Sequence, residues 1–87
     1  MSILEEAKKI VEGDRKEEYG DMSESFTRIA RFWSAYLNVR INSLDVAKMM
    51  ILLKVSRAKN TNHRDSFIDI IGYVQCIDEL LEKHYGD

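Results

Sequence analysis

Residues 43–59 read SLDVAKMMILLKVSRAK, and between residues 46 and 55 every position except Lys48 and Lys54 is apolar. Ser43 is of a type that commonly caps the N-terminus of a helix, so the stretch predicts a helix over residues 43–59. A helix that is apolar nearly all round is either the central helix of a bundle or packs a second face against another copy of the chain. We favour the second alternative and expect a homo-oligomer.

The remaining sequence predicts three further helices, because apolar residues recur at helical spacing and the alternation typical of strands is missing. These helices span residues 2–12, 21–37 and 62–85. Asp21 and Glu24 have the spacing of an acidic capping box, and Asn62 is the N-cap expected for the last helix. We therefore predict an all-α fold, a compact, oligomeric bundle of about four helices in a single domain over residues 1–87.

The composition indicates a globular protein that spans no membrane. Hydrophobic residues make up 45% of the chain and charged residues 32%, which is too apolar for disorder, and no apolar run is long enough to cross a bilayer. The acidic start MSILEEAKK lacks the basic region of a signal peptide, and the single cysteine, Cys76, has no disulfide partner, so we expect a cytoplasmic location. A net charge of -2 gives no general attraction to nucleic acid, which we do not expect to bind.

A basic run without any acid, KVSRAKNTNHR, occupies residues 54–64 between the last two predicted helices. Unpaired N–H groups at a helix start and the helix dipole favour an anion, so this run predicts a phosphate site. The side chains that would bind the phosphate are Lys54, Arg57, His63 and Arg64. The alternative is a solvated basic turn whose cations suit the C-terminal end of the preceding helix.

Two aspartates, Asp65 and Asp69, lie one helical turn apart in HRDSFIDIIGYV, residues 63–74. Two carboxylates on adjacent turns suit a magnesium ion, which prefers oxygen ligands. Asp65 also fits a helix cap, but Asp69 lies among large apolar residues, where a carboxylate requires a partner. That partner is either a divalent metal ion or a basic side chain. The candidate basic residues are Arg57, Lys54 and an arginine of the second helix.

A second polar cluster, DRKEEYGD, occupies residues 14–21. Glu18, Asp21 and Glu24 follow one another at three-residue spacing. If this segment is helical, the three acids lie near one face and Asp21 adds a third ligand to the magnesium site. Glu18 or Glu24 would then serve as the general base. The Tyr19 ring precedes a glycine and would stack on a nucleotide base. The alternative is structural, with Glu18 solvated, the other two acids capping the helix and Tyr19 packed against the core.

Four motifs in this order resemble a family of short phage and prophage proteins of mostly unassigned function. They cover nearly the whole chain and read DRKEEYGD (14–21), FTRIARFWSAYL (26–37), DVAKMMILLKVSRAKN (45–60) and HRDSFIDIIGYV (63–74). That family is in turn distantly similar to the MazG-like, all-α nucleoside triphosphate pyrophosphohydrolases, in which magnesium held by acids on helices promotes cleavage between the α and β phosphates. The shared part is a basic helix followed by an acid-rich helix, here Lys54 and Arg57 followed by Asp65 and Asp69.

The acids of this chain depart from the pattern of those enzymes. The enzymes carry an E-x-x-E pair and an E-x-x-D pair, whereas this chain has Glu18-x-x-Asp21-x-x-Glu24 and Asp65-x-x-x-Asp69. The resemblance implies a phage-type nucleotide-binding protein in the cytoplasm of a bacterial host, with magnesium as cofactor if it is a pyrophosphohydrolase of this type. The alternative is a non-catalytic anti-defence protein that sequesters a nucleotide second messenger or blocks a host protein.

Overall fold

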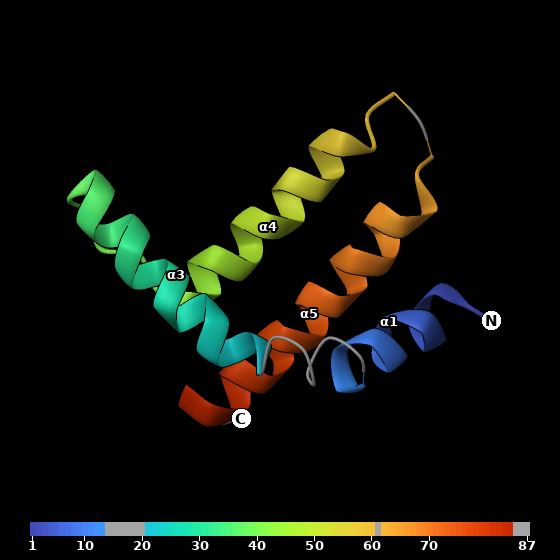
Figure 1. Ribbon diagram of the computed structural model, residues 1–87, viewed down its shortest axis with the longest axis horizontal. Coiled ribbons are helices and arrows are strands. Elements are labelled where there is room, and N and C mark those ends of the chain that lie inside the picture. Colours follow the sequence, from blue (N-terminus) through green and yellow to red (C-terminus); the bar gives the residue numbers. More distant parts are fainter. Residues whose placement is uncertain (14–20, 61, 85–87) are drawn as a thin grey trace.

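The computed structural model describes residues 1–13, 21–60 and 62–84, and these residues form four helices (Figure 1). They are α1 (Ile3–Glu12), α3 (Met22–Leu37), α4 (Ser43–Arg57) and α5 (Arg64–His84). No strand occurs within the described ranges, so the all-α prediction is confirmed for them. The oligomeric state stays a prediction.

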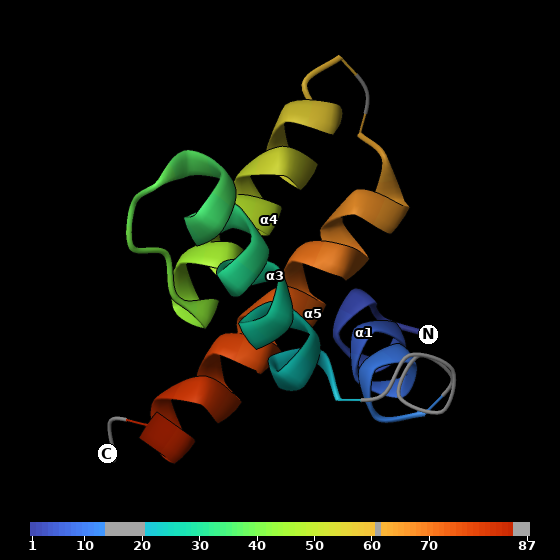
Figure 2. The same ribbon diagram turned by 60° about the vertical axis from the view of Figure 1, so that its left-hand side comes forward.

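Helix α5 is the centre of the arrangement, because it contacts each of the other three helices. α4 and α5 lie side by side and antiparallel, α1 packs along the first half of α5, and α3 lies across the start of α4 and the later turns of α5 (Figures 1 and 2). The sequence left open whether α4 is the central helix. It lies instead to one side of α5, and part of its apolar surface is exposed.

Side-chain caps fix the starts of α1 and α4. Ser2 and Glu5 form a capping box at the start of α1. At α4, the Asn42 amide oxygen accepts the Asp45 N–H at 2.8 Å, while the Asp45 carboxylate accepts the Asn42 N–H at 3.1 Å. The prediction of Ser43 as the N-cap was therefore wrong by one residue, because the acid of this reciprocal pair lies three residues after the cap.

The starts of α3 and α5 also differ in detail from the prediction. Asp21 caps α3, but without the predicted capping box: its carboxylate accepts hydrogen bonds from the N–H and the hydroxyl of Ser23, both at 3.0 Å. α5 starts after His63 instead of at Asn62, because the His63 carbonyl accepts the Ser66 N–H at 3.0 Å and so closes the first turn. None of the described helices is long and apolar enough to cross a membrane.

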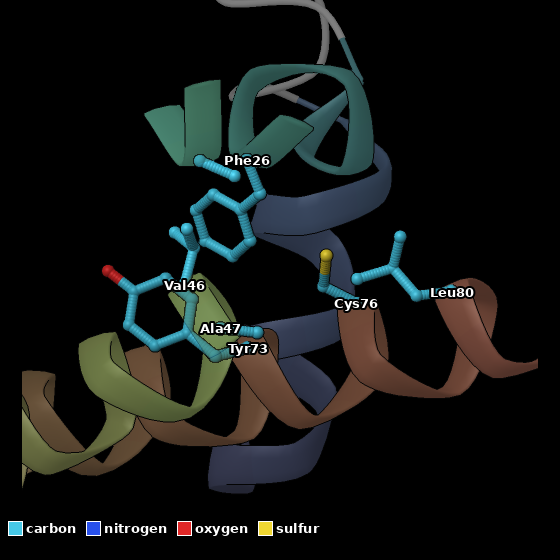
Figure 3. Close-up of a cluster of buried hydrophobic side chains, with 7 residues drawn as sticks. Phe26, Val46, Ala47, Tyr73, Cys76 and Leu80 are labelled. Carbon is cyan, nitrogen blue, oxygen red and sulfur yellow. The ribbon is translucent and has the colours of Figure 1, made fainter. Parts of the chain in front are cut away.

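The core lies where α3 crosses α4 and α5 (Figure 3). The Phe26 ring of α3 lies with its centroid 5.8 Å from that of Tyr73 on α5. The buried cluster consists of Phe26, Ala30, Val46, Ala47, Tyr73, Cys76 and Leu80. A chain of this length buries a limited share of its surface on folding, so these few side chains together carry much of the stability.

Cys76 lies in this core with no exposed surface. Burial raises the pKa of its thiol to about 12, and the negative charges of Glu79 and Asp21 add to the shift. Because the thiolate is the reactive form, we expect Ellman's reagent to modify the native protein about a hundredfold more slowly than the urea-unfolded chain at about pH 8. Absorbance of the released thiolate measures both rates, and equal rates would show that Cys76 is accessible in the folded protein.

Candidate functional site

The Asp69 carboxylate pairs with the Lys54 ammonium across the α4–α5 hairpin. Lys54 Nζ lies 2.9 Å from Asp69 Oδ2, and the two side chains are 15% and 26% exposed. Among the cations considered from sequence, Lys54 is therefore the partner in the described structure. The Arg57 alternative was wrong, because Arg57 is the last residue of α4 and is exposed to solvent.

Asp69 also borders a small cavity where α1 packs against α5. The cavity has a volume of about 10 Å³, which is room for roughly one water molecule and far too little for a nucleotide. Gly72 permits this close packing, because a Cβ at that position would lie 3.1 Å from the Val11 side chain. A ligand that contacts Asp69 would therefore approach from the solvent side of the ion pair.

The predicted phosphate-binding residues fall into two groups. Arg64 is engaged with α1, where its guanidinium pairs with Glu6 and donates a hydrogen bond to the Met1 carbonyl at 2.9 Å. His63 Nδ1 lies 2.9 Å from the Ser66 hydroxyl. Lys54, paired with Asp69, and the exposed Arg57 remain at the end of α4. The structure therefore brings Lys54 and Asp69 together but uses Arg64 to hold the N-terminal helix.

The acids predicted as magnesium ligands do not converge in the described structure. Asp65 is exposed in the first turn of α5, and Asp69 is paired with Lys54. Asp21 Oδ2 lies 3.4 Å from Lys83 Nζ, and the fourteen residues from Asp69 to Lys83 span about 21 Å along α5. Within the described ranges, no three His, Cys, Asp or Glu side chains form a group that could hold a metal ion.

The remaining predicted site residues are spread over the first part of the chain. Glu24 is exposed in the first turn of α3. Glu18 and Tyr19 lie outside the described residues. Trp33 of α3 packs against the core cluster. Magnesium binding and the catalytic role of Glu18 or Glu24 therefore stay predictions.

Asp21 stabilises the chain through its charged form. Partial burial raises the pKa of its carboxyl group, but hydrogen bonds from the Ser23 amide and hydroxyl and the charge of Lys83 together outweigh burial, so the pKa lies below its ordinary value. A carboxyl group whose pKa is lower in the folded chain contributes stability above its unfolded pKa of about 4, and this contribution is lost as the pH falls through the folded value.

We therefore expect wild type to be more stable than Asp21→Asn at neutral pH and the difference to shrink as the pH falls below about 4. Asparagine also accepts a hydrogen bond at an N-cap, so the comparison isolates the charge. Urea unfolding at a series of pH values measures the difference. A difference that is constant down to about pH 2 would show that the Asp21 charge does not stabilise the fold.

An open groove that the sequence did not suggest lies between α3 and the start of α4. Its volume is about 490 Å³, and it is lined by Thr27, Ala30, Arg31, Ser34, Ile41, Asn42 and Ser43. Two of its hydroxyls are engaged with backbone: Thr27 donates to the Ser23 carbonyl at 2.9 Å, and Ser34 donates to the Ile41 carbonyl at 3.0 Å. Arg31 is an exposed cation at this groove. A substitution of Arg31 can therefore be compared with substitutions of the basic residues at the α4–α5 junction.

Residues 2–81 match a family model described as "Domain of unknown function (DUF6378)". The chain belongs to the DUF6378 family. Similar curated proteins include the "Gene 55 protein" of Mycobacterium phage D29, with 46% identity over 83 residues, and the "Gene 55 protein" of Mycobacterium phage L5, with 44% identity over 82 residues. This confirms the resemblance to a phage family of unassigned function, whereas the similarity to MazG-like enzymes stays a prediction.

The match covers most of this DUF6378 chain but only part of its relatives. The aligned residues make up 94% and 92% of this chain, and 55% and 53% of the D29 and L5 proteins. The chain therefore spans about half the length of the curated relatives it matches. No solved structure matches it.

Proposed function

We propose that this DUF6378 chain binds a phosphorylated small molecule, a nucleotide or nucleotide derivative, at the α4–α5 junction. The observation that carries the proposal is the Lys54–Asp69 pair, which joins a cation of α4 to a carboxylate of α5 at 2.9 Å in a partly exposed position. A nucleotide offers anionic phosphate oxygens to a cation, and it offers hydroxyl and amino donors to a carboxylate.

Two further cations support a phosphate contact at this end of the hairpin. Arg57 and Lys59 are exposed beyond Lys54, and neither forms an ion pair within the described part of the chain. An exposed arginine can bind phosphate through two parallel hydrogen bonds. The charge of these side chains is therefore available to a ligand without breaking an interaction that holds the fold.

The positions of the aspartates favour a chain that binds the nucleotide without hydrolysing it. Asp21 caps α3 and pairs with Lys83 in the last turns of α5, whereas Asp69 lies in the first half of α5 and pairs with Lys54. Membership in a family with phage proteins also fits a protein that sequesters a nucleotide second messenger. Pyrophosphohydrolysis would require a set of acids that the described residues do not bring together.

Titration calorimetry with ATP, the deoxynucleoside triphosphates, ADP-ribose and a cyclic dinucleotide, with and without magnesium, tests the proposal. We expect Arg57→Met to weaken binding about tenfold, because the variant loses a charge-assisted hydrogen bond. Lys8→Met removes an exposed lysine of α1 and should leave the affinity unchanged. Loss of binding in Arg31→Met but not in Arg57→Met would assign the ligand to the α3–α4 groove and overturn the proposed site.

Chromatography of each mixture after incubation separates the two outcomes of binding. Recovery of the intact nucleotide supports sequestration. Release of pyrophosphate that disappears in Asp69→Ala supports the enzyme prediction instead. If none of these nucleotides binds, both forms of the proposal are wrong.

A further inference from the structure

Helices α4 and α5 each present an exposed apolar row outside the core. On α4 the exposed fractions are 37% for Met49, 66% for Leu52 and 52% for Val55. On α5 an exposed residue recurs at every seventh position, with Phe67 at 38%, Val74 at 47% and Leu81 at 42%. We call these six residues the outer apolar surface.

The outer apolar surface is turned away from α3. The core side chains of α4 and α5 lie on the side of these helices that faces α3 (Figure 3). At about 100° per residue, Leu52 lies about 120° round α4 from the buried Val46, and Val74 lies about 100° round α5 from the buried Tyr73. The helices of the described structure therefore leave these apolar side chains open to solvent.

The row through Leu52 is self-complementary in charge. Asp45, Leu52 and Lys59 follow one another at seven-residue spacing, with Leu52 in the middle. Asp45 lies in the first turn of α4. Lys59 is exposed and follows the C-terminal end of α4, and the Lys59 N–H donates to the Ser56 carbonyl at 3.3 Å. When two such helices lie antiparallel with Leu52 at the crossing, the Asp45 end of each helix lies beside the turn that carries Lys59 in the other copy.

We propose that a second copy of this chain covers the outer apolar surface, with the two α4 helices antiparallel and a twofold axis beside Leu52. A twofold interface requires a surface that complements itself, and the acid–apolar–base order of this row satisfies that requirement. α4 has 15 residues and is about 22 Å long, too short to bury the roughly 800 Å² per partner typical of a stable interface. The row on α5 therefore has to contribute, and we expect dissociation at micromolar concentrations.

Sedimentation velocity across about 1–200 μM tests the assembly. Wild type should change from monomer to dimer within this range, whereas Leu52→Asp should stay monomeric. Leu4→Asp is the matched control, because Leu4 on α1 is also 66% exposed, and it should dimerise like wild type. A wild-type monomer at every concentration would overturn the proposal and leave a different protein as the occupant of this surface.

Two further variants test the register and do not depend on how well Leu52→Asp folds. Lys59→Glu should raise the dissociation constant about tenfold, whereas the same change at the exposed Lys8 of α1 should not. Leu52→Cys should form a disulfide between copies on mild oxidation, because cysteines beside a twofold axis come within bonding distance, while Leu4→Cys should not. A dimer that Lys59→Glu leaves unchanged and Leu52→Cys does not cross-link would show that the copies meet elsewhere.

Discussion

Leu80→Ala is expected to lower the free energy of unfolding by about 3 kcal/mol and the melting temperature by roughly 15 °C. Leu80 has no exposed surface and belongs to the core cluster where α3 packs on α5. Removing its terminal carbons loses their transfer free energy and leaves a cavity that the surrounding helices fill only in part. Since a chain of this size has a total stability of about 5–10 kcal/mol, this is a large share of it.

Urea unfolding followed by circular dichroism measures this loss. Leu4→Ala is the control, because it makes the same chemical change at a position that is 66% exposed, and it should alter the free energy of unfolding by less than about 0.5 kcal/mol. Equal effects of the two substitutions would contradict the placement of the core at the crossing of α3 with α5.

The helices were predictable from sequence because their signals are local. Apolar spacing and capping residues lie within a few positions of each other, and α1 was expected over residues 2–12 and begins at Ile3. The errors concern the ends of helices, where neighbouring residues compete for one role. Asn42 and Ser43 are both good caps, and the acid three residues after Asn42 decides between them.

The partner of Asp69 was not predictable, because it depends on how α4 is rotated against α5. Lys54 and Arg57 are three residues apart and lie near the same side of α4, so spacing alone does not separate them. The pairs of Arg64 with Glu6 and of Lys83 with Asp21 join residues about sixty positions apart, and no local pattern announces such contacts. The basic run was therefore interpreted as one cluster, although the structure divides it between the hairpin and α1.

The outer apolar surface was predictable from the sequence only in part. The apolar character of α4 on every side correctly indicated a surface in excess of one core. The sequence did not indicate that α5 occupies the centre and carries a second exposed row at seven-residue spacing. The side chains of α4 and α5 that become buried depend on where α3 crosses these two helices. That position depends on contacts between α3 and the other helices, which local sequence patterns do not show.

Lys54→Met is expected to lower the free energy of unfolding by about 2 kcal/mol, because it leaves the Asp69 carboxylate unpaired in a partly buried position. A fully buried pair would cost more, but solvent reaches both side chains here and weakens the effect. Asp69→Leu should cost less, under about 1 kcal/mol, because the long Lys54 side chain can turn its ammonium group toward solvent.

The double variant Lys54→Met/Asp69→Leu distinguishes an ion pair from two independent contributions. The neighbours of Asp69 at the small cavity are largely apolar, including Ile10 and Met22, so an apolar replacement of Asp69 meets apolar side chains. We expect the double variant to be more stable than Lys54→Met alone, since no charge is left without its partner. Asp78→Leu, at an exposed aspartate of the same helix, controls for the change of residue type.

Urea unfolding of the four chains of this cycle gives the coupling free energy between the two side chains. If the effects of Lys54→Met and Asp69→Leu simply add, the 2.9 Å pair does not contribute to the stability of the hairpin. If they couple as expected, Lys54 also links folding to the proposed function. A phosphate that binds the Lys54 ammonium group would weaken its contact with Asp69. Because Lys54→Met lacks this phosphate contact, nucleotide binding should stabilise the variant less than wild type.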